Sequence, residues 1–169
     1  MRHYPNAMDF SLKPPTRFAP AERETVERIR EEHEMLVSSE AAAAVLAAVD
    51  ERLAVVNENR QLVHANAGFL RFVGVSTLAD ILGMRLGELL GCVHAIEDLS
   101  GCGTHPTCRT CGTVNSALRA LAGRSCVAEV NLVVERAGRE QALDFDLEAT
   151  PLYLRGRLFA LVRLDPIER

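Results

Sequence analysis

Four of the five cysteines in this chain fall within one short stretch. They are Cys92, Cys102, Cys108 and Cys111, separated by nine, five and two residues. Thiolates are soft ligands, and four of them around one point suit zinc or an iron–sulfur cluster. We therefore predict that the four cysteines bind one metal centre.

The spacing of the cysteines bears on the identity of the metal. Structural zinc usually uses two Cys-x-x-Cys pairs, whereas this chain has one, formed by Cys108 and Cys111. Iron–sulfur clusters tolerate irregular spacing in glycine-rich loops. Such glycines flank the two single cysteines at Gly91, Gly101 and Gly103, where they allow positive φ angles and turn backbone N–H groups toward sulfur. The pattern favours an iron–sulfur cluster by a small margin and leaves zinc open.

The Cys108–Cys111 pair also allows a redox interpretation. Both residues are expected at the start of a helix, where exposed amides and the helix dipole stabilise thiolate and lower its pKa. Gly112 would leave room beside them for a metal or a sulfide. A thiol–disulfide protein is therefore one alternative, although the strand–helix–strand setting of thioredoxin-like enzymes is missing.

Three further side chains bear on the site. His94 and His105 lie in the same stretch and could replace a cysteine ligand or contact one. Because loop histidines are more often simply solvated, we assign these two no role. Cys126 lies on a predicted strand, where we expect it to fill the core rather than substitute for a ligand.

The composition is that of an ordinary folded chain, with 48% hydrophobic residues, 25% charged residues and a net charge of −4. There is no Trp and no basic patch with interleaved aromatics, so we expect no nucleic-acid partner. The longest apolar run, 41–49, is too short to span a membrane, and residues 1–20 lack a signal segment. We therefore expect a cytoplasmic protein, in which clustered cysteines favour metal or redox chemistry over disulfides.

Hydrophobic patterning divides the chain into three parts. Four prolines make residues 1–20 an expected flexible tail. Residues 21–44 are predicted to be an amphipathic helix, which could pair with its twin in a homodimer or pack on its own domain. Residues 45–165 form the main domain, which contains the cysteine-rich loop 87–117.

Apolar periodicity within the main domain predicts strands at both ends and short helices between them. The predicted strands are 53–57, 61–66, 126–135, 143–150 and 158–164. The predicted helices are 67–73, 78–82, 86–90 and 111–121. We expect residues 91–110 to form a loop, and Pro151 to lie at a sheet edge or a strand end.

The order of these elements resembles that of a PAS domain. Three stretches are similar to the first hairpin and following helix of that family: Val55-Val56-Asn57, Val63-His64-Ala65-Asn66-Ala67 and Phe72-Val73-Gly74. A second pattern resembles a cysteine-rich PAS subgroup found in bacterial sensor proteins: Gly87-Glu88 … Gly91-Cys92 … Ala95 … Gly101-Cys102-Gly103 … Cys108-x-x-Cys111-Gly112 … Ala117. The resemblance implies an α+β fold, with a five-stranded antiparallel sheet, short helices on one face and an N-terminal helical extension.

The resemblance also implies a function. PAS domains generally sense ligands, oxygen or redox state and pass the signal through helices at their ends. One oxygen-sensing PAS family holds a four-iron cluster on four cysteines, but as two Cys-x-x-Cys pairs. We therefore expect a signal-transduction sensor rather than an enzyme, responding to oxygen or redox state and acting on a signalling partner such as a histidine kinase. A structural zinc-binding interaction module is the main alternative.

Overall fold

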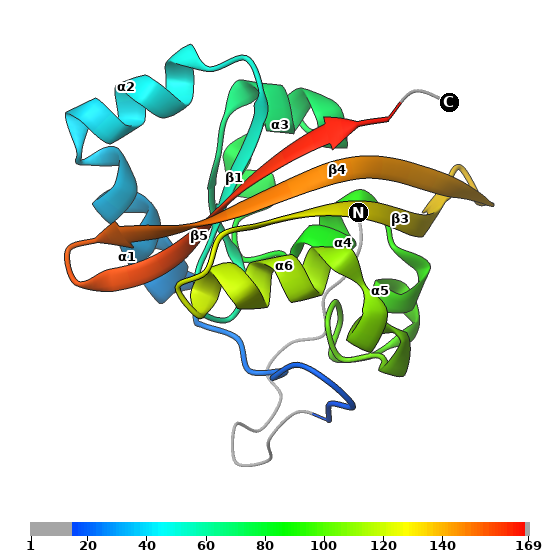
Figure 1. Ribbon diagram of the computed structural model, residues 1–169. Helices are drawn as coiled ribbons and strands as arrows, with labels where there is room; N and C mark the ends of the chain where they lie inside the picture. The colour runs from blue at the N-terminus through cyan, green and yellow to red at the C-terminus, as the bar shows by residue number, and fades with distance from the viewer. Residues whose placement is uncertain (1–14, 168–169) are drawn as a thin grey trace.

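An antiparallel sheet forms the centre of the computed structural model, which describes residues 15–167. Its strands are β1 (Arg52–Val56), β2 (Leu62–Ala65), β3 (Cys126–Arg136), β4 (Arg139–Leu154) and β5 (Arg157–Pro166). They lie side by side in the order β2-β1-β5-β4-β3, and every neighbouring pair is antiparallel (Figure 1). The sheet confirms the predicted α+β architecture.

Short helices connect the hairpin β1–β2 to the other three strands. They are α3 (Ala67–Val73), η1 (Leu78–Asp80), α4 (Leu86–Leu90), α5 (Val93–Glu97), η2 (Pro106–Thr110) and α6 (Gly112–Leu121), of which η1 and η2 are 3-10 helices. In Figure 1, α4, α5 and α6 lie near one another, toward the lower right of the view. The prediction of a loop at 91–110 was wrong for α5 and η2, whose single turns are too short to produce a helical periodicity.

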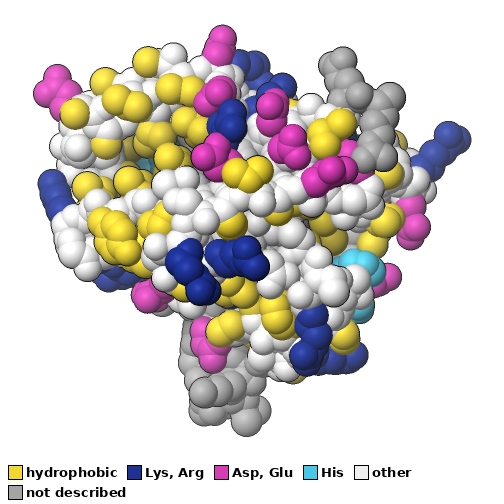
Figure 2. Space-filling view, viewed as in Figure 1, with side chains coloured by type: hydrophobic (Ala, Val, Ile, Leu, Met, Phe, Trp, Pro, Cys, Tyr) yellow, Lys and Arg dark blue, Asp and Glu magenta, His cyan; other side chains and the backbone are white. Residues whose placement is uncertain are grey.

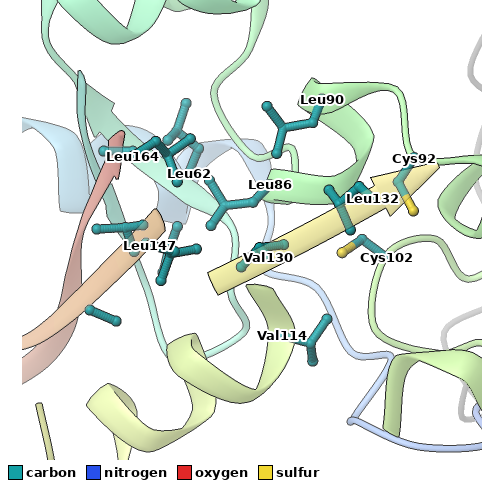
Figure 3. Close-up of a cluster of buried hydrophobic side chains, with 14 of the residues drawn as sticks. Leu62, Leu86, Leu90, Cys92, Cys102, Val114, Val130, Leu132, Leu147 and Leu164 are labelled. Atoms are coloured by element: carbon teal, nitrogen blue, oxygen red, sulfur yellow. The ribbon is translucent and has the colours of Figure 1, made fainter. Parts of the chain in front are cut away.

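One face of the sheet packs against these helices and forms the main hydrophobic core. Phe69, Phe145 and Leu147 are completely buried in it, and burial of each such side chain contributes roughly 1.5–3 kcal/mol. Cys92 and Cys102 belong to the same core and lie toward one end of it (Figure 3). These two cysteines are therefore part of the packed interior.

The opposite face of the sheet is covered by α1 (Val26–Val37), which is followed by α2 (Glu40–Ala48). Ile29 and Leu36 of α1 pack with Val55 and Phe159 of the sheet in a second, smaller core. The amphipathic stripe within 21–44 thus packs on its own domain. Pairing of the N-terminal helices in a homodimer stays a prediction. No helix within residues 15–167 is long and apolar enough to cross a lipid bilayer.

A buried carboxylate holds α1 in register on the sheet. Glu32 is completely buried, and its Oε1 lies 2.6 Å from Arg157 Nη2. Its Oε2 accepts a hydrogen bond from Asn57 Nδ2 at 2.8 Å. Desolvating a charged pair costs about as much as the attraction returns, so these contacts mainly specify where the helix sits.

Pro151 lies within β4 and pairs with Ala160 of β5. β3 begins at Cys126, which pairs with Ala149 of β4. On the side facing away from β5, no strand of the described residues therefore reaches Pro151. Pro151 thus lies at an edge of the sheet, as predicted, although only at this point of β4. A proline fits there because no neighbouring strand needs a hydrogen bond from its missing N–H.

Two histidines stack where α1 meets β2. The rings of His33 and His64 have centroids 5.4 Å apart and planes inclined by 19°. His33 Nδ1 also lies 2.9 Å from the Val63 carbonyl oxygen. Burial, with the charge of His33 adding to it, lowers the pKa of His64 to about 4.

The free energy of unfolding is therefore expected to fall as the pH is lowered from about 6.5 to about 4. In that range the unfolded chain binds a proton at His64 that the folded chain does not, with a slope of at most about 1.4 kcal/mol per pH unit. The measurement is urea denaturation at several pH values for the wild type and for His64→Phe, which cannot titrate. Equal slopes for both proteins would show that another group is responsible.

Candidate functional site

The cysteine loop, residues 91–111, closes one end of the main core. At its start, Cys92 forms an isolated bridge with Val134 of β3, and at its end Cys111 directly precedes α6 without a side-chain capping bond. Cys92, Cys102 and Cys108 are only 5–7% exposed, and Cys111 is half-buried. The loop thus places three sulfurs in the interior and one at its margin.

Backbone amides near the three buried sulfurs lower the pKa of each thiol, against the larger opposite effect of burial. They are the amides of His94 and Ala95 for Cys92, of Gly87 for Cys102, and of Gly103 and His105 for Cys108. Gly103 has a φ of 97°, as predicted, and its role of turning an N–H toward sulfur stays a prediction. The amides of Gly91 and Gly101 instead donate to the carbonyls of Glu88 and Asp98.

The four cysteines share one region but do not form a tetrad. A Cβ at Gly87 would lie 2.7 Å from Cys102 Sγ and 3.5 Å from Cys92 Cβ, which places both cysteines beside this glycine. Negative charge on Cys111 would raise the pKa of Cys92, Cys102 and Cys108, so the four cysteines are close enough to interact electrostatically. Within residues 15–167, however, no three of the sulfurs lie within 4.8 Å of one another. The predicted convergence on one point is not confirmed.

Burial decides the protonation state of these thiols. It raises the pKa of Cys92 and of Cys108, and it raises the pKa of Cys102 to about 12, with the charge of Glu88 adding to the effect. The predicted lowering of the Cys108 pKa was wrong, because Cys108 is buried within η2 instead of standing at the start of α6. This result weakens the thiol–disulfide alternative, which needs a low-pKa thiol.

Two residues near the predicted site serve in packing. A Cβ at Gly112 would lie 2.9 Å from Val130 Cγ2, so this glycine lets α6 approach β3. The space that we expect beside Gly112 for a metal or a sulfide is filled by Val130. Cys126 packs against the main core, and its Sγ donates to the Ser116 carbonyl at 3.6 Å. The expectation that Cys126 fills the core is confirmed.

Arg85 ties the cysteine loop to two other parts of the chain. It is completely buried, and its guanidinium donates to five backbone carbonyls at 2.8–3.4 Å. The acceptors are Pro20 and Glu22 before α1, Asn59 in the β1–β2 turn, and Ser100 and Cys102 in the loop. Burial, followed by the charges of two neighbouring arginines, lowers the pKa of Arg85 to about 9.

Arg60 brings a second buried cation to the cysteines. It is 4% exposed and donates to the Pro20 carbonyl at 2.6 Å, while its Nε has no hydrogen-bond partner. Burial lowers the pKa of Arg60, and negative charge on Cys102 or Cys108 would raise it. Sequence reasoning missed both arginines, because an arginine in a turn and one before a short helix look like ordinary solvated residues.

One carboxylate, Glu88, interacts with three arginines near the loop. It raises the pKa of both Arg60 and Arg85, and it pairs with Arg23. Negative charge on Cys102 would likewise raise the pKa of Arg60 and Arg85, so a thiolate there would be stabilised by the two arginines.

The N-terminal segment 16–22 lies directly on the cysteine loop. The amides of Arg17 and Ala19 donate to the carbonyls of Thr104 and Gly103, each at 2.9 Å. Arg109 Nη2 donates in turn to the Arg17 carbonyl at 2.8 Å. The flexible tail predicted at 1–20 thus has packed contacts from residue 16 onward, and its first 14 residues lie outside the described part. This segment leads into α1 and so connects the loop to the far face of the sheet.

A small cavity adjoins the loop. It is lined by Arg60, Arg85, Cys102 and the first turns of α6, and its volume is about 10 Å³. Thr113 Oγ1, which has no hydrogen-bond partner, also belongs to its lining. A space of this size holds about one water molecule. The thiol donors fit a soft metal, but a cluster would require the loop to move outward.

The sequence matches no known family profile and no curated protein, but it is similar to solved structures. The Rhodobacter sphaeroides LOV protein is 19% identical over 86% of this chain and 70% of its own, with a TM-score of 0.52. The PAS domain of BvgS from Bordetella pertussis is 12% identical over 79% of this chain and 88% of its own, with a TM-score of 0.54. A PAS domain from a two-component sensor histidine kinase is 14% identical over 78% of this chain and 97% of its own, with a TM-score of 0.50.

These likenesses agree with the order of elements described above. The antiparallel sheet has the short helices and α6 on one face and the N-terminal helix on the other. The resemblance to a cysteine-rich subgroup stays a prediction. The chain has the PAS fold.

Proposed function

We propose that this protein is a non-catalytic PAS sensor whose cysteines Cys92, Cys102, Cys108 and Cys111 bind a metal centre that responds to oxygen or redox state. The observation that carries the proposal is the burial of Cys92, Cys102 and Cys108, with Cys102 lining the same small cavity as the buried arginines Arg60 and Arg85. Neutral thiols gain little from nearby positive charge, whereas thiolates gain from it. Since burial raises the thiol pKa values, a metal is needed to displace the protons.

The spacing of the sulfurs bears on which metal is bound. With Zn–S bonds of about 2.3 Å, the four sulfurs of a tetrahedral zinc site stand about 3.8 Å apart. An iron–sulfur cluster spreads its thiolates over several irons, so they stand further apart. No three sulfurs of the described residues lie within 4.8 Å of one another. The sulfurs therefore form no ready-made tetrahedral zinc site, and either metal requires the loop to adjust.

The arginines supply a route from the loop to the N-terminal helix. Arg85 binds the Cys102 carbonyl in the loop and the Glu22 carbonyl before α1. A change in the loop on oxidation or loss of the metal therefore alters how the segment before α1 is held. The PAS-fold relative from a two-component sensor histidine kinase supports a signalling partner of that kind.

The test is purification with and without oxygen, followed by measurement of iron, zinc and acid-labile sulfide. We expect iron and sulfide in the anaerobic protein and their loss in air. Zinc without sulfide, unaffected by air, would identify the zinc-binding interaction module instead. Cys102→Ser should lose the metal, whereas Cys126→Ser, outside the loop, should keep it. A colourless, metal-free and folded protein from both preparations would refute the proposal.

A further inference from the structure

Two histidines and a glutamate converge on the surface of the cysteine loop. Potential ligand atoms of His94, Glu97 and His105 all lie within 4.8 Å of one another, the one such group among residues 15–167. Figure 2 shows histidine side chains with an acidic side chain beside them, over the region that α5 occupies in Figure 1. The three side chains are arranged before any ion is bound.

Two separate turns of the chain bring these residues together. His94 and Glu97 stand three apart on α5 and so face the same way, with Glu97 Oε2 3.3 Å from His94 Nδ1. His105 comes from the turn before η2, and its ring stacks on His94 with centroids 4.6 Å apart and planes inclined by 9°.

The donor set suits a divalent transition metal. Two imidazoles and one carboxylate are a common ligand set for zinc and for related ions. His94 and His105 are half-buried and Glu97 is exposed, so an ion from solvent can reach them and water can complete its coordination. The nearly parallel rings must rotate to aim their lone pairs at one ion. His105 Nδ1 now accepts the Thr107 amide at 3.2 Å, a bond that coordination through this nitrogen would replace.

We propose that His94, Glu97 and His105 form a surface site for a divalent transition-metal ion such as Zn²⁺, separate from the cysteine centre. The site uses nitrogen and oxygen ligands only, so it stands whether or not the cysteines bind a metal. It lies on the outer surface of the same loop, because its side chains are half-buried or exposed whereas Cys92 and Cys108 are buried.

Co²⁺ titration of the full chain, reduced and free of oxygen, tests the site. The His94→Ala/His105→Ala double variant is expected to bind one Co²⁺ fewer per chain than the wild type. His33→Gln is the matched control, since it changes one member of the other stacked histidine pair, and it should bind as many ions as the wild type. Circular dichroism of each variant checks that the fold is retained.

Absorption separates the two sites, because thiolate-bound Co²⁺ has a sulfur-to-metal charge-transfer band that nitrogen and oxygen ligands lack. Loss of one ion with this band unchanged supports the surface site. An unchanged stoichiometry overturns it, and so does loss of the band in the double variant, which would make the histidines ligands of the cysteine centre. If Co²⁺ binding depends on the histidines and no protein shows the thiolate band, the surface site is supported and only the proposed cysteine centre is contradicted.

Discussion

Replacing Arg85 with Met is expected to destabilise the protein by about 3–5 kcal/mol. The guanidinium is completely buried and donates to five backbone carbonyls from three separate segments. Methionine fills much of the same volume but leaves these carbonyls without their donor, and each unsatisfied buried group costs roughly 1–3 kcal/mol. Methionine also removes the cost of burying a charge, which offsets part of this loss. The expected loss of stability is therefore smaller than the summed cost of five unsatisfied carbonyls.

Urea denaturation of three variants measures the effect. Arg85→Lys keeps the charge but has fewer donors, so we expect an intermediate loss. Arg119→Met, on the exposed side of α6, is the control and should change stability by less than about 0.5 kcal/mol. If Arg85→Met lost no more than the control, the five carbonyls would have to be satisfied by water, and the proposed route from the loop to α1 would have no structural basis.

Replacing Gly87 with Ala is expected to destabilise the protein by about 1–3 kcal/mol. Within a helix, alanine is normally the better residue by roughly 0.5–1 kcal/mol, and Gly87 lies in α4. Here the new Cβ would stand 2.7 Å from Cys102 Sγ and 3.2 Å from Cys102 Cβ. Cys102 must therefore move, and the sign of the usual helix effect is reversed.

A double-mutant cycle with Cys102→Ala isolates this contact. Cys102→Ala removes the sulfur, so Gly87→Ala should cost less in that background than in the wild type. The metal content of Gly87→Ala alone should also fall if Cys102 is a ligand. Stabilisation of both backgrounds by Gly87→Ala would show that Cys102 does not pack against this glycine.

Most of the fold could be predicted from the sequence, because its signals are local. β3 and β4 alternate apolar and polar side chains over many residues, and Gly74 and Gly91 end α3 and α4 with positive φ angles of 75° and 80°. The helices α5 and η2 were missed because five residues are too few to establish a period.

The candidate site was predicted less completely, because its members act over long separations. The cysteines were recognised by residue type and clustering alone. Arg85 and its acceptor Glu22 are 63 residues apart, and no local pattern indicates that one will bind the other. The same holds for Gly87, whose small size matters only because Cys102 packs against it.

The sequence by itself determined the order of strands and helices and the kinds of ligand atom available, since periodicity and side-chain chemistry are properties of short stretches. Only the tertiary structure decided that the thiols are buried with raised pKa values, that two arginines stand beside them, and that His94, Glu97 and His105 meet at the surface. The physical reason is that desolvation, charge and ligand geometry depend on atoms brought together from distant parts of the chain.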